Sequence, residues 1–454
     1  MYAFALSVFG VTTFWCGHAS SITSFIAARF FCGIGAGGVA TMANIILSDI
    51  VKIQYRGIYQ SYLNVCYGLG NGLGASLGGL IADRFGWRIA FYAQVPLIVV
   101  LLIFSVSVTP ASLGPALARA EGKSITKSLS SFDFLGAITL ALTITGLILG
   151  INLGGNMLPW SHPVVIISLS VFVFSGFALI MVERHASRPL LPLHLLATVP
   201  YGNLNWGNLI GAMLSAIANF NLPLFLQAVK QVSPTEAGLI LLSPLVGLTI
   251  SSVFVGFAIS WTSKLKIFVL LGAASQLLGM IACGLLTKTM PLAPIIAMIP
   301  LVSTGQGSFF PASTVSTLSL SGSEEQAIVV TTLSLVRNLG SILGVATSSW
   351  ILQNLLLILL NMKVTGSTKE KENIIREVRS SVKAISTLQP ETRRQVIAAY
   401  ETSLRYTFLS CALLGVVLCV LVFPIRIPDV HQENDDGRSA RSASSSLSHV
   451  DEGG

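Results

Sequence analysis

The chain has 454 residues, of which 53% are hydrophobic and only 10% are charged, and its mean hydropathy is +0.77. Soluble domains carry about 25% charged residues, so this composition excludes a water-soluble enzyme or binding domain and indicates a lipid bilayer. The net charge of +8 does not indicate nucleic-acid binding, because the basic residues lie between apolar runs, as is typical of membrane topology.

Twelve apolar runs are long enough to cross a membrane, since a spanning helix needs about 20 largely apolar residues. The first run lacks the basic start and cleavage site of a signal peptide, and more runs follow it, so we count it as a span. The predicted spans are 1–19, 23–47, 58–82, 89–109, 134–154, 163–183, 204–228, 236–261, 267–287, 291–316, 328–357 and 404–425.

The loops between these runs indicate the orientation of the chain. One set of short loops carries more Lys and Arg than the opposite set, so the positive-inside rule places both termini in the cytosol. The polar segment 358–403, rich in Lys, Arg and Glu, does not fit this rule. Residues 426–454 are rich in Ser, Asp and Arg, and we expect a disordered cytosolic tail.

The third run contains "VCYGLGNGLGASLGGLIADRFGWR" (65–88), with seven glycines. Glycine costs roughly 1 kcal/mol in a helix relative to alanine, but in lipid small residues let helix backbones pack closely. We therefore expect a glycine stripe for helix packing and gating, formed by Gly70, Gly74, Gly78 and Gly79.

The second run, "ARFFCGIGAGGVATMANIILSDI" (28–50), has a similar face with Gly33 and Gly37, and Gly35 and Gly38 beside them. It also holds Arg29, and a membrane-embedded arginine almost always faces protein or a water-filled cavity. The alternative is an arginine whose long side chain reaches the lipid headgroups.

These two stretches resemble motifs of the major facilitator superfamily. "RFFCGIGAGG" is similar to the fourth-helix motif R-x-x-Q-G-x-G, with Cys32 in place of glutamine. "GNGLGASLGG" resembles the fifth-helix antiporter motif G-x-x-x-G-P-x-x-G-G, with Ala75 in place of proline. "NIILSDIVKIQYRGIYQ", the 358–403 insertion and the phrase around Arg337 resemble the fungal fourteen-span drug:proton antiporters, and most of all the vacuolar basic amino acid transporters.

The resemblance implies an all-α major facilitator fold, with the twelve spans corresponding to helices three to fourteen of the family. The alternative is a complete twelve-span transporter. On the first alignment the resemblance implies four parts. Residues 1–109 form an N-terminal bundle of four spans, and residues 110–203 form a linker with two extra spans. Residues 204–425 form a C-terminal six-helix bundle that includes the polar loop 358–403, and residues 426–454 form the tail.

Charged and amide residues inside the spans are the candidate site. No carboxylate lies in the middle of a predicted span, so Arg29 is the first candidate for proton coupling and Arg337 the second. Asp49 and Arg56 bracket a predicted cytosolic loop, where we expect them to hold a gate by charge pairing. The candidates for substrate binding are Asn64, Asn71, Asn219, Asn221 and Gln306; Asn205, Asn208 and Gln227 are further amides of the seventh span.

We therefore predict a proton-coupled secondary transporter that moves basic amino acids into the vacuole by alternating access. Multidrug or toxin:proton antiport at the plasma membrane is the alternative, and a transport-inactive fragment or sensor is the second. The sequence has no H-E-x-x-H motif and no phosphate-binding loop, so an enzyme is not expected. The predicted partners are a small-molecule substrate, protons and lipid; we expect a monomer without cofactor, metal or nucleic acid.

Overall fold

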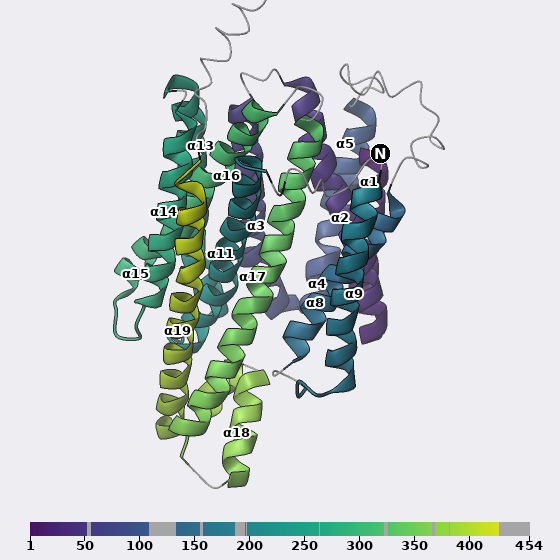
Figure 1. Ribbon diagram of the computed structural model, residues 1–454. Coiled ribbons are helices and arrows are strands. Elements are labelled where there is room, and N and C mark those ends of the chain that lie inside the picture. Colours follow the sequence, from purple (N-terminus) through teal and green to yellow (C-terminus); the bar gives the residue numbers. More distant parts are fainter. Residues whose placement is uncertain are drawn as a thin grey trace, which may run out of the picture. The chain divides into compact units, whose positions relative to one another are not determined.

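The structure is a computed structural model that describes residues 1–51, 56–108, 133–154, 158–186, 196, 198–262, 264–321, 326–365, 368–380 and 382–425. Within these ranges the regular elements are helices, and the one β feature is an isolated bridge between Gly154 and Leu158 (Figure 1). The predicted tail, 426–454, and residues 110–132 of the predicted linker lie outside the described residues.

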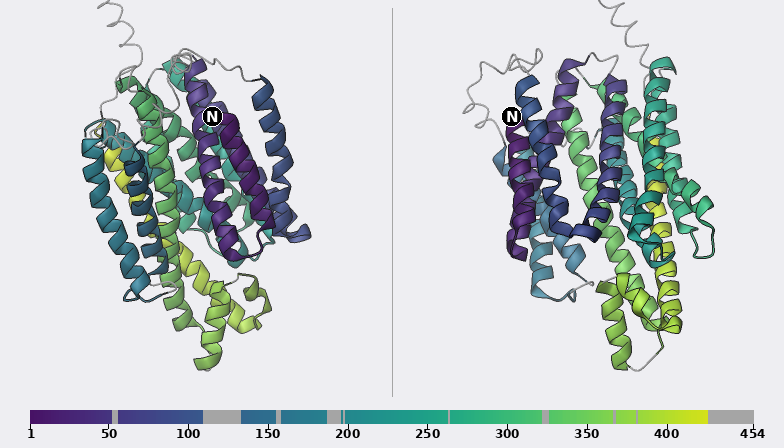
Figure 2. Two further views of the ribbon diagram at one scale, coloured as in Figure 1. Left: turned by 90° about the vertical axis from the view of Figure 1, so that its right-hand side faces the viewer. Right: turned by 180° about the vertical axis from the view of Figure 1, so that it is seen from behind.

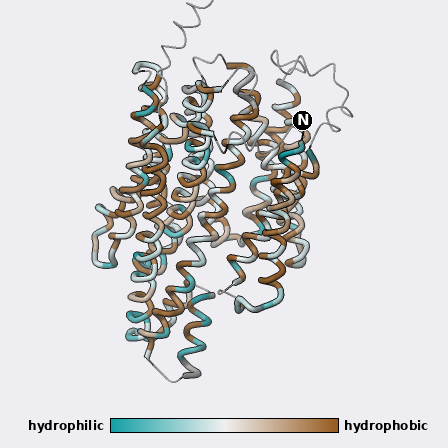
Figure 3. The backbone as a smooth tube through the Cα atoms, in the orientation of Figure 1, coloured by the Kyte–Doolittle hydropathy of each residue, from teal (hydrophilic) through white to brown (hydrophobic). Residues whose placement is uncertain are grey.

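Ten helical segments among the described residues are long and apolar enough to span a membrane. They coincide with ten of the predicted spans, which confirms the all-α membrane class. The other two predicted spans are helices α1 (Tyr2–His18), which has only 17 residues, and α3 (Arg56–Phe85), which is interrupted by glycine and amide residues. Figure 3 shows hydrophobic residues along most of the helices.

The chain divides into two compact units. Unit 1 contains Met1–Phe132 and Val232–Leu242, and unit 2 contains Asp133–Gln231 and Ser243–Gly454. Unit 1 holds α1, α2 (Ile22–Ile50), α3, α4 (Trp87–Tyr92), α5 (Gln94–Val108) and α12 (Pro234–Ile240). Unit 2 holds α8 (Phe134–Leu153), α9 (Pro163–His185), α11 (Tyr201–Ala228), α13 (Leu242–Thr262, apart from its first residue), α14 (Leu265–Gly284), α15 (Leu292–Met298), α16 (Pro300–Leu320), α17 (Gln326–Lys363), α18 (Thr368–Ser380), a 3-10 turn (Val382–Thr387) and α19 (Pro390–Val422).

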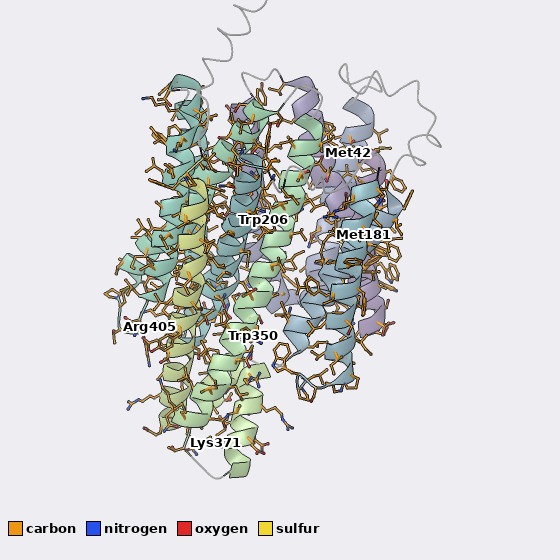
Figure 4. All side chains as sticks on the ribbon, in the orientation of Figure 1. Met42, Met181, Trp206, Trp350, Lys371 and Arg405 are labelled. Carbon is orange, nitrogen blue, oxygen red and sulfur yellow. The ribbon has the colours of Figure 1, made fainter. Side chains whose placement is uncertain are left out.

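The predicted extra pair of spans, α8 and α9, belongs to unit 2. Helix α8 packs on α17, and the rings of Trp160 and Trp350 meet edge to face with centroids 6.4 Å apart (Trp350 is labelled in Figure 4). The four-part domain division itself stays a prediction.

Close packing in unit 1 joins α1 and α2. A Cβ placed on Gly35 would lie 2.6 Å from the backbone nitrogen of Phe9, and one on Gly38 would lie 2.9 Å from the Cβ of Ala5. At the end of α3, Gly86 has φ +90°, a conformation that side chains disfavour, and there the chain turns into α4. Glycine thus serves both helix contact and chain reversal in this unit.

Helix α11 is the centre of unit 2 and packs against α14, α16, α17 and α19. Its contact with α17 is a backbone-to-backbone approach. A Cβ on Gly340 would collide with the carbonyl of Leu209, and one on Gly344 would lie 2.8 Å from Cα of Met213. Because these glycines are four residues apart, they lie on one face of α17 and set its position along α11.

A second glycine contact joins α14 to α16. A Cβ on Gly272 would lie 2.6 Å from the backbone nitrogen of Phe309, and one on Gly279 would lie 2.5 Å from that of Val302. From the other side, a Cβ on Gly305 would lie 2.6 Å from the backbone nitrogen of Gln276. The α11–α17 and α14–α16 interfaces therefore both require glycine at these positions, because a side chain there would collide with the backbone of the facing helix.

The polar segment 358–403 is mostly helical. Helix α17 continues to Lys363, α18 follows, and α19 begins at Pro390 rather than near residue 404. Helix α18 is amphipathic: Ile375 and Val378 are buried, while Glu372 and Arg376 are exposed. A hydropathy average over this segment is low, although its apolar residues form one packed face. Figure 2 shows α18 beside the adjoining ends of α17 and α19.

Hydrogen bonds gather at the C-terminal end of α11, in a group of residues that we call the α11 junction: Lys230, Gln231, Lys288, Arg393 and Glu401. The ammonium group of Lys230 donates to the carbonyls of Lys288 (2.9 Å) and Met290 (2.5 Å). The backbone N–H of Lys288 donates to Glu401 (2.9 Å), and Arg393 donates to Gln231 (2.8 Å). The junction connects α11, the α14–α15 loop and α19.

The α14–α16 contact predicts that Gly272→Ala destabilises the protein by about 1–3 kcal/mol, the usual cost of forcing extra atoms into a packed interior. The matched control is Gly176→Ala in α9, where the added Cβ would lie 3.6 Å from Thr143, an ordinary contact. Thermal unfolding of the detergent-solubilised protein, followed by tryptophan fluorescence, measures both. Equal melting temperatures for the two variants would contradict the close contact.

The α11 junction predicts that Lys230→Met lowers stability by about 1 kcal/mol for each hydrogen bond lost. The control is Lys264→Met, because Lys264 is exposed. Burial lowers the pKa of the Lys230 ammonium, and nearby Glu401 opposes this shift. The folded state therefore binds fewer protons than the unfolded state below pH 10.5, and stability rises with pH there. The stability difference between wild type and Lys230→Met should grow as pH approaches 10.5; a constant difference would contradict this.

Candidate functional site

Arg337 on α17 is the centre of a polar cluster that joins three helices of unit 2. Its Nε donates to Oδ1 of Asn208 on α11 at 2.7 Å. Its Nη2 donates to the carbonyl of Phe310 at 3.0 Å and to the hydroxyl of Thr314 at 2.7 Å, both on α16. The guanidinium carbon lies 4.4 Å from the centroid of the Phe310 ring. Three helices thus fix one guanidinium group.

Asn208 and Ser313 complete the cluster and are fully buried. Asn208 donates through Nδ2 to the carbonyl of Leu204 (2.8 Å), and its Oδ1 also accepts from the hydroxyl of Ser313 (3.2 Å). Both polar ends of Asn208 are therefore satisfied. Asn208 was one of several equivalent amides in the sequence, and its position at the α11–α17 contact distinguishes it from the others.

The contacts that the described residues make with the Arg337 guanidinium all come from neutral groups. Asn208 lies seven residues from the start of α11, which is about 10 Å along the helix axis. A cation at this depth is expensive in lipid and is retained for a functional or structural reason. Of the three guanidinium nitrogens, Nη1 makes no hydrogen bond within the described residues.

Gln276 on α14 is a second unusual group, and the sequence analysis missed it. Its side chain is fully buried, and neither Nε2 nor Oε1 has a hydrogen-bond partner in the part of the chain that the structure describes. A buried polar group without a partner costs about 1–3 kcal/mol. A Cβ on Gly211 would lie 3.3 Å from Oε1 of Gln276 and 3.4 Å from Cε1 of Phe310, so the amide lies beside the edge of the ring that supports Arg337.

The other predicted amides lie apart from this cluster. Asn221 is fully buried and donates to the carbonyl of Ile217 (2.9 Å), whereas Asn219 is exposed. Both are more than ten residues from Asn208 along α11, a distance above about 15 Å. Gln306 is half-buried and lies one helical turn before Phe310. Their role in substrate binding stays a prediction.

Arg29 of α2 is exposed and lies in unit 1, where it approaches the thiol of Cys16. The side chains of Asn64, Asn71, Asp49 and Arg56 lie outside the described residues. The coupling role of Arg29 and the gate formed by Asp49 and Arg56 therefore stay predictions.

The predicted glycine faces make no close contact among the residues that the structure describes. Close contact on α2 comes from Gly35 and Gly38. No described atom lies within 4 Å of a Cβ placed on Gly33, Gly37, Gly70, Gly74, Gly78 or Gly79. Their role in packing and gating stays a prediction.

One enzyme-like pattern of the sequence lacks the structure that its chemistry needs. Residues 74–78 read G-x-S-x-G, but they lie inside helix α3, whereas a nucleophile elbow needs a sharp turn between strand and helix. Among the described residues, no three His, Cys, Asp or Glu side chains group as they would around a metal ion. The polar cluster at Arg337 is suited to binding polar groups in a membrane.

Comparison with known proteins agrees with this architecture. A model of the Major Facilitator Superfamily matches residues 1–201. The chain is 32% identical over 422 residues to "Multidrug resistance protein fnx1" of Schizosaccharomyces pombe, covering 91% of this chain and 77% of that protein. It is 30% identical over 431 residues to "Vacuolar basic amino acid transporter 2" of Saccharomyces cerevisiae, covering 92% and 90%.

A solved structure supports the fold. The crystal structure of an auto-inhibited POT family peptide transporter superposes with a TM-score of 0.54 at 13% identity, covering 94% of this chain and 83% of that one. Similarity at this identity concerns the fold alone. Together with the two sequence relatives, which match along nearly the whole chain, it gives the assignment: this chain is a multi-pass membrane protein of the major facilitator superfamily.

Proposed function

We propose that this chain is a proton-coupled transporter that moves basic amino acids into the vacuole by alternating access. The observation that carries the proposal is the similarity to Vacuolar basic amino acid transporter 2, which extends over 90% of that protein. In this family two helix bundles hold the solute between them near the middle of the membrane and open to either side in turn.

The polar groups of the described residues are compatible with an amino acid. An amino acid needs acceptors for its ammonium groups and donors for its carboxylate, and amide and guanidinium side chains supply both. Gln276 and Arg337 provide such groups inside unit 2. For coupling, Arg29 is our candidate, because a charged residue within a span marks a substrate or ion pathway.

A second function has a specific observation in its favour. The relative that is 32% identical carries the name of a multidrug resistance protein. Proton-driven export of drugs or toxins at the plasma membrane is therefore the alternative. The two functions differ in the membrane that holds the protein and in the solute that moves.

The test is ATP-driven uptake of radiolabelled lysine, arginine and histidine into isolated vacuolar vesicles that contain the chain, with and without a protonophore. We expect uptake that the protonophore abolishes. Vesicles from a strain without the chain provide the background. If the chain reaches a membrane but none of the three amino acids accumulates, and cells instead become resistant to toxic cations, the export function replaces the proposal.

The coupling role of Arg29 predicts that Arg29→Ala lowers proton-driven uptake about tenfold, which corresponds to about 1.4 kcal/mol. Arg29→Lys keeps the charge and should retain more uptake. Exchange of labelled for unlabelled lysine without a proton gradient should change less than driven uptake in Arg29→Ala. Equal loss of exchange and driven uptake would assign Arg29 to folding or solute binding and not to coupling.

A further inference from the structure

Arg337 is a cation that the described part of unit 2 does not neutralise. Amide, carbonyl and hydroxyl oxygens and one aromatic ring surround its guanidinium. They belong to Asn208, Phe310, Ser313 and Thr314. Charged residues within a membrane pair with an opposite charge or with backbone carbonyls, and here the described contacts are all with neutral groups. The charge is thus stabilised but not cancelled, which leaves it available to an anionic group from outside these residues.

The guanidinium is held in a geometry that suits an incoming anion. Hydrogen bonds from Nε to Asn208 and from Nη2 to Phe310 and Thr314 orient the guanidinium, and the guanidinium carbon lies over the Phe310 ring. Nη1 keeps both of its N–H groups without a partner among the described residues. Arg337 is half-buried. The free Nη1 of a guanidinium fixed in this way can donate a charge-assisted hydrogen bond to a carboxylate oxygen.

Gln276 is an independent observation that points to a ligand at the same place. Its amide is fully buried and without a hydrogen-bond partner in the described structure, and it lies at Gly211 beside the edge of the Phe310 ring. An amide offers one acceptor and one donor group. Two donors without a partner among the described residues thus lie near one ring: Nη1 of Arg337 and Nε2 of Gln276.

We propose that Arg337 binds the carboxylate of the transported solute, and that Gln276 provides hydrogen bonds to the same solute. This rests on the proposed function and adds a requirement to it: the solute carries a carboxylate, as an amino acid does. A polyamine or a cationic drug has no such group. Arg29 is not needed for this contact and remains available for coupling.

The first experiment uses the wild-type chain in vesicles and compares lysine with cadaverine, which is lysine without its carboxylate. Lysine should inhibit the uptake of labelled lysine, and cadaverine should inhibit at least about tenfold more weakly, because a site built to hydrogen-bond a group rejects the analogue that lacks it. Lysinamide should resemble cadaverine. Equal inhibition by all three compounds in an active wild type overturns this inference and leaves the proposed function intact.

The second experiment assigns the preference to Arg337. In Arg337→Gln the KM for lysine should rise about tenfold, while the inhibition constant of cadaverine stays the same, so the preference for the carboxylate disappears. The matched control is Arg405→Gln on α19, because Arg405 lies outside the cluster (labelled in Figure 4). Arg337→Lys should keep part of the preference, since it retains the charge but not the planar fork. A persistent preference in Arg337→Gln overturns the inference.

A measurement on the purified wild type does not depend on any variant folding. Lysine should raise the melting temperature of the detergent-solubilised chain more than cadaverine does at equal concentration, since a ligand that binds the native state stabilises it. Chloride and acetate separate a general anion site from a carboxylate site: acetate should protect and chloride should not. Equal protection by both anions overturns the carboxylate assignment. Failure of all amino acid uptake, by contrast, overturns the proposed function.

Discussion

The polar cluster of unit 2 depends on one physical contact, the approach of the α11 and α17 backbones at Gly340 and Gly344. In lipid, helices gain little from hiding apolar surface from one another, so contact between small residues determines how they pack. Gly340 lies against the carbonyl of Leu209, next to Asn208, and three residues after Arg337. This approach brings the guanidinium within 2.7 Å of the amide. A larger side chain at Gly340 would separate both the helices and the two polar groups.

The neutral surroundings of Arg337 explain how the structure retains a cation in an apolar bundle. Donation to an amide oxygen, a carbonyl and a hydroxyl replaces part of the water that the guanidinium loses, and the Phe310 ring adds a cation–π contact. These groups stabilise the charge without cancelling it. A carboxylate from the protein would do both and would compete with a solute for the same nitrogen atoms.

Much of the fold follows from the sequence alone. Long apolar runs can only be helices in a bilayer, because each backbone N–H and C=O group needs an internal partner there. Arg337 could be singled out from the sequence because it is a charged residue well inside a predicted span, where a charge is costly. Helix breaks at Ala93, Leu241 and Ile299 were not predicted, and neither was the early start of α19. An average of hydropathy cannot distinguish a broken helix from a continuous one, or a packed amphipathic helix from a polar loop.

Gln276 could not be predicted because a single amide in an apolar run is usually a satisfied core residue, and its lack of a partner depends on three different helices. Asn208 had the same signal in the sequence as Asn205 or Asn221. Gly35 and Gly38, and not their neighbours Gly33 and Gly37, face α1, because the rotation of α2 about its axis is set by its packing partner. Residue type was visible in the sequence, while the direction of each side chain required the assembled bundle.

The α11 junction has a mechanical consequence for unit 2. Its hydrogen bonds join α11, the α14–α15 loop and α19 at one end, so relative motion of these elements there would break several bonds at once. We expect this end to act as a pivot. Helix α11 has 28 residues, a length of about 42 Å. A tilt of about 5° at the pivot would move the far end of α11 by about 4 Å, a displacement larger than the length of a hydrogen bond.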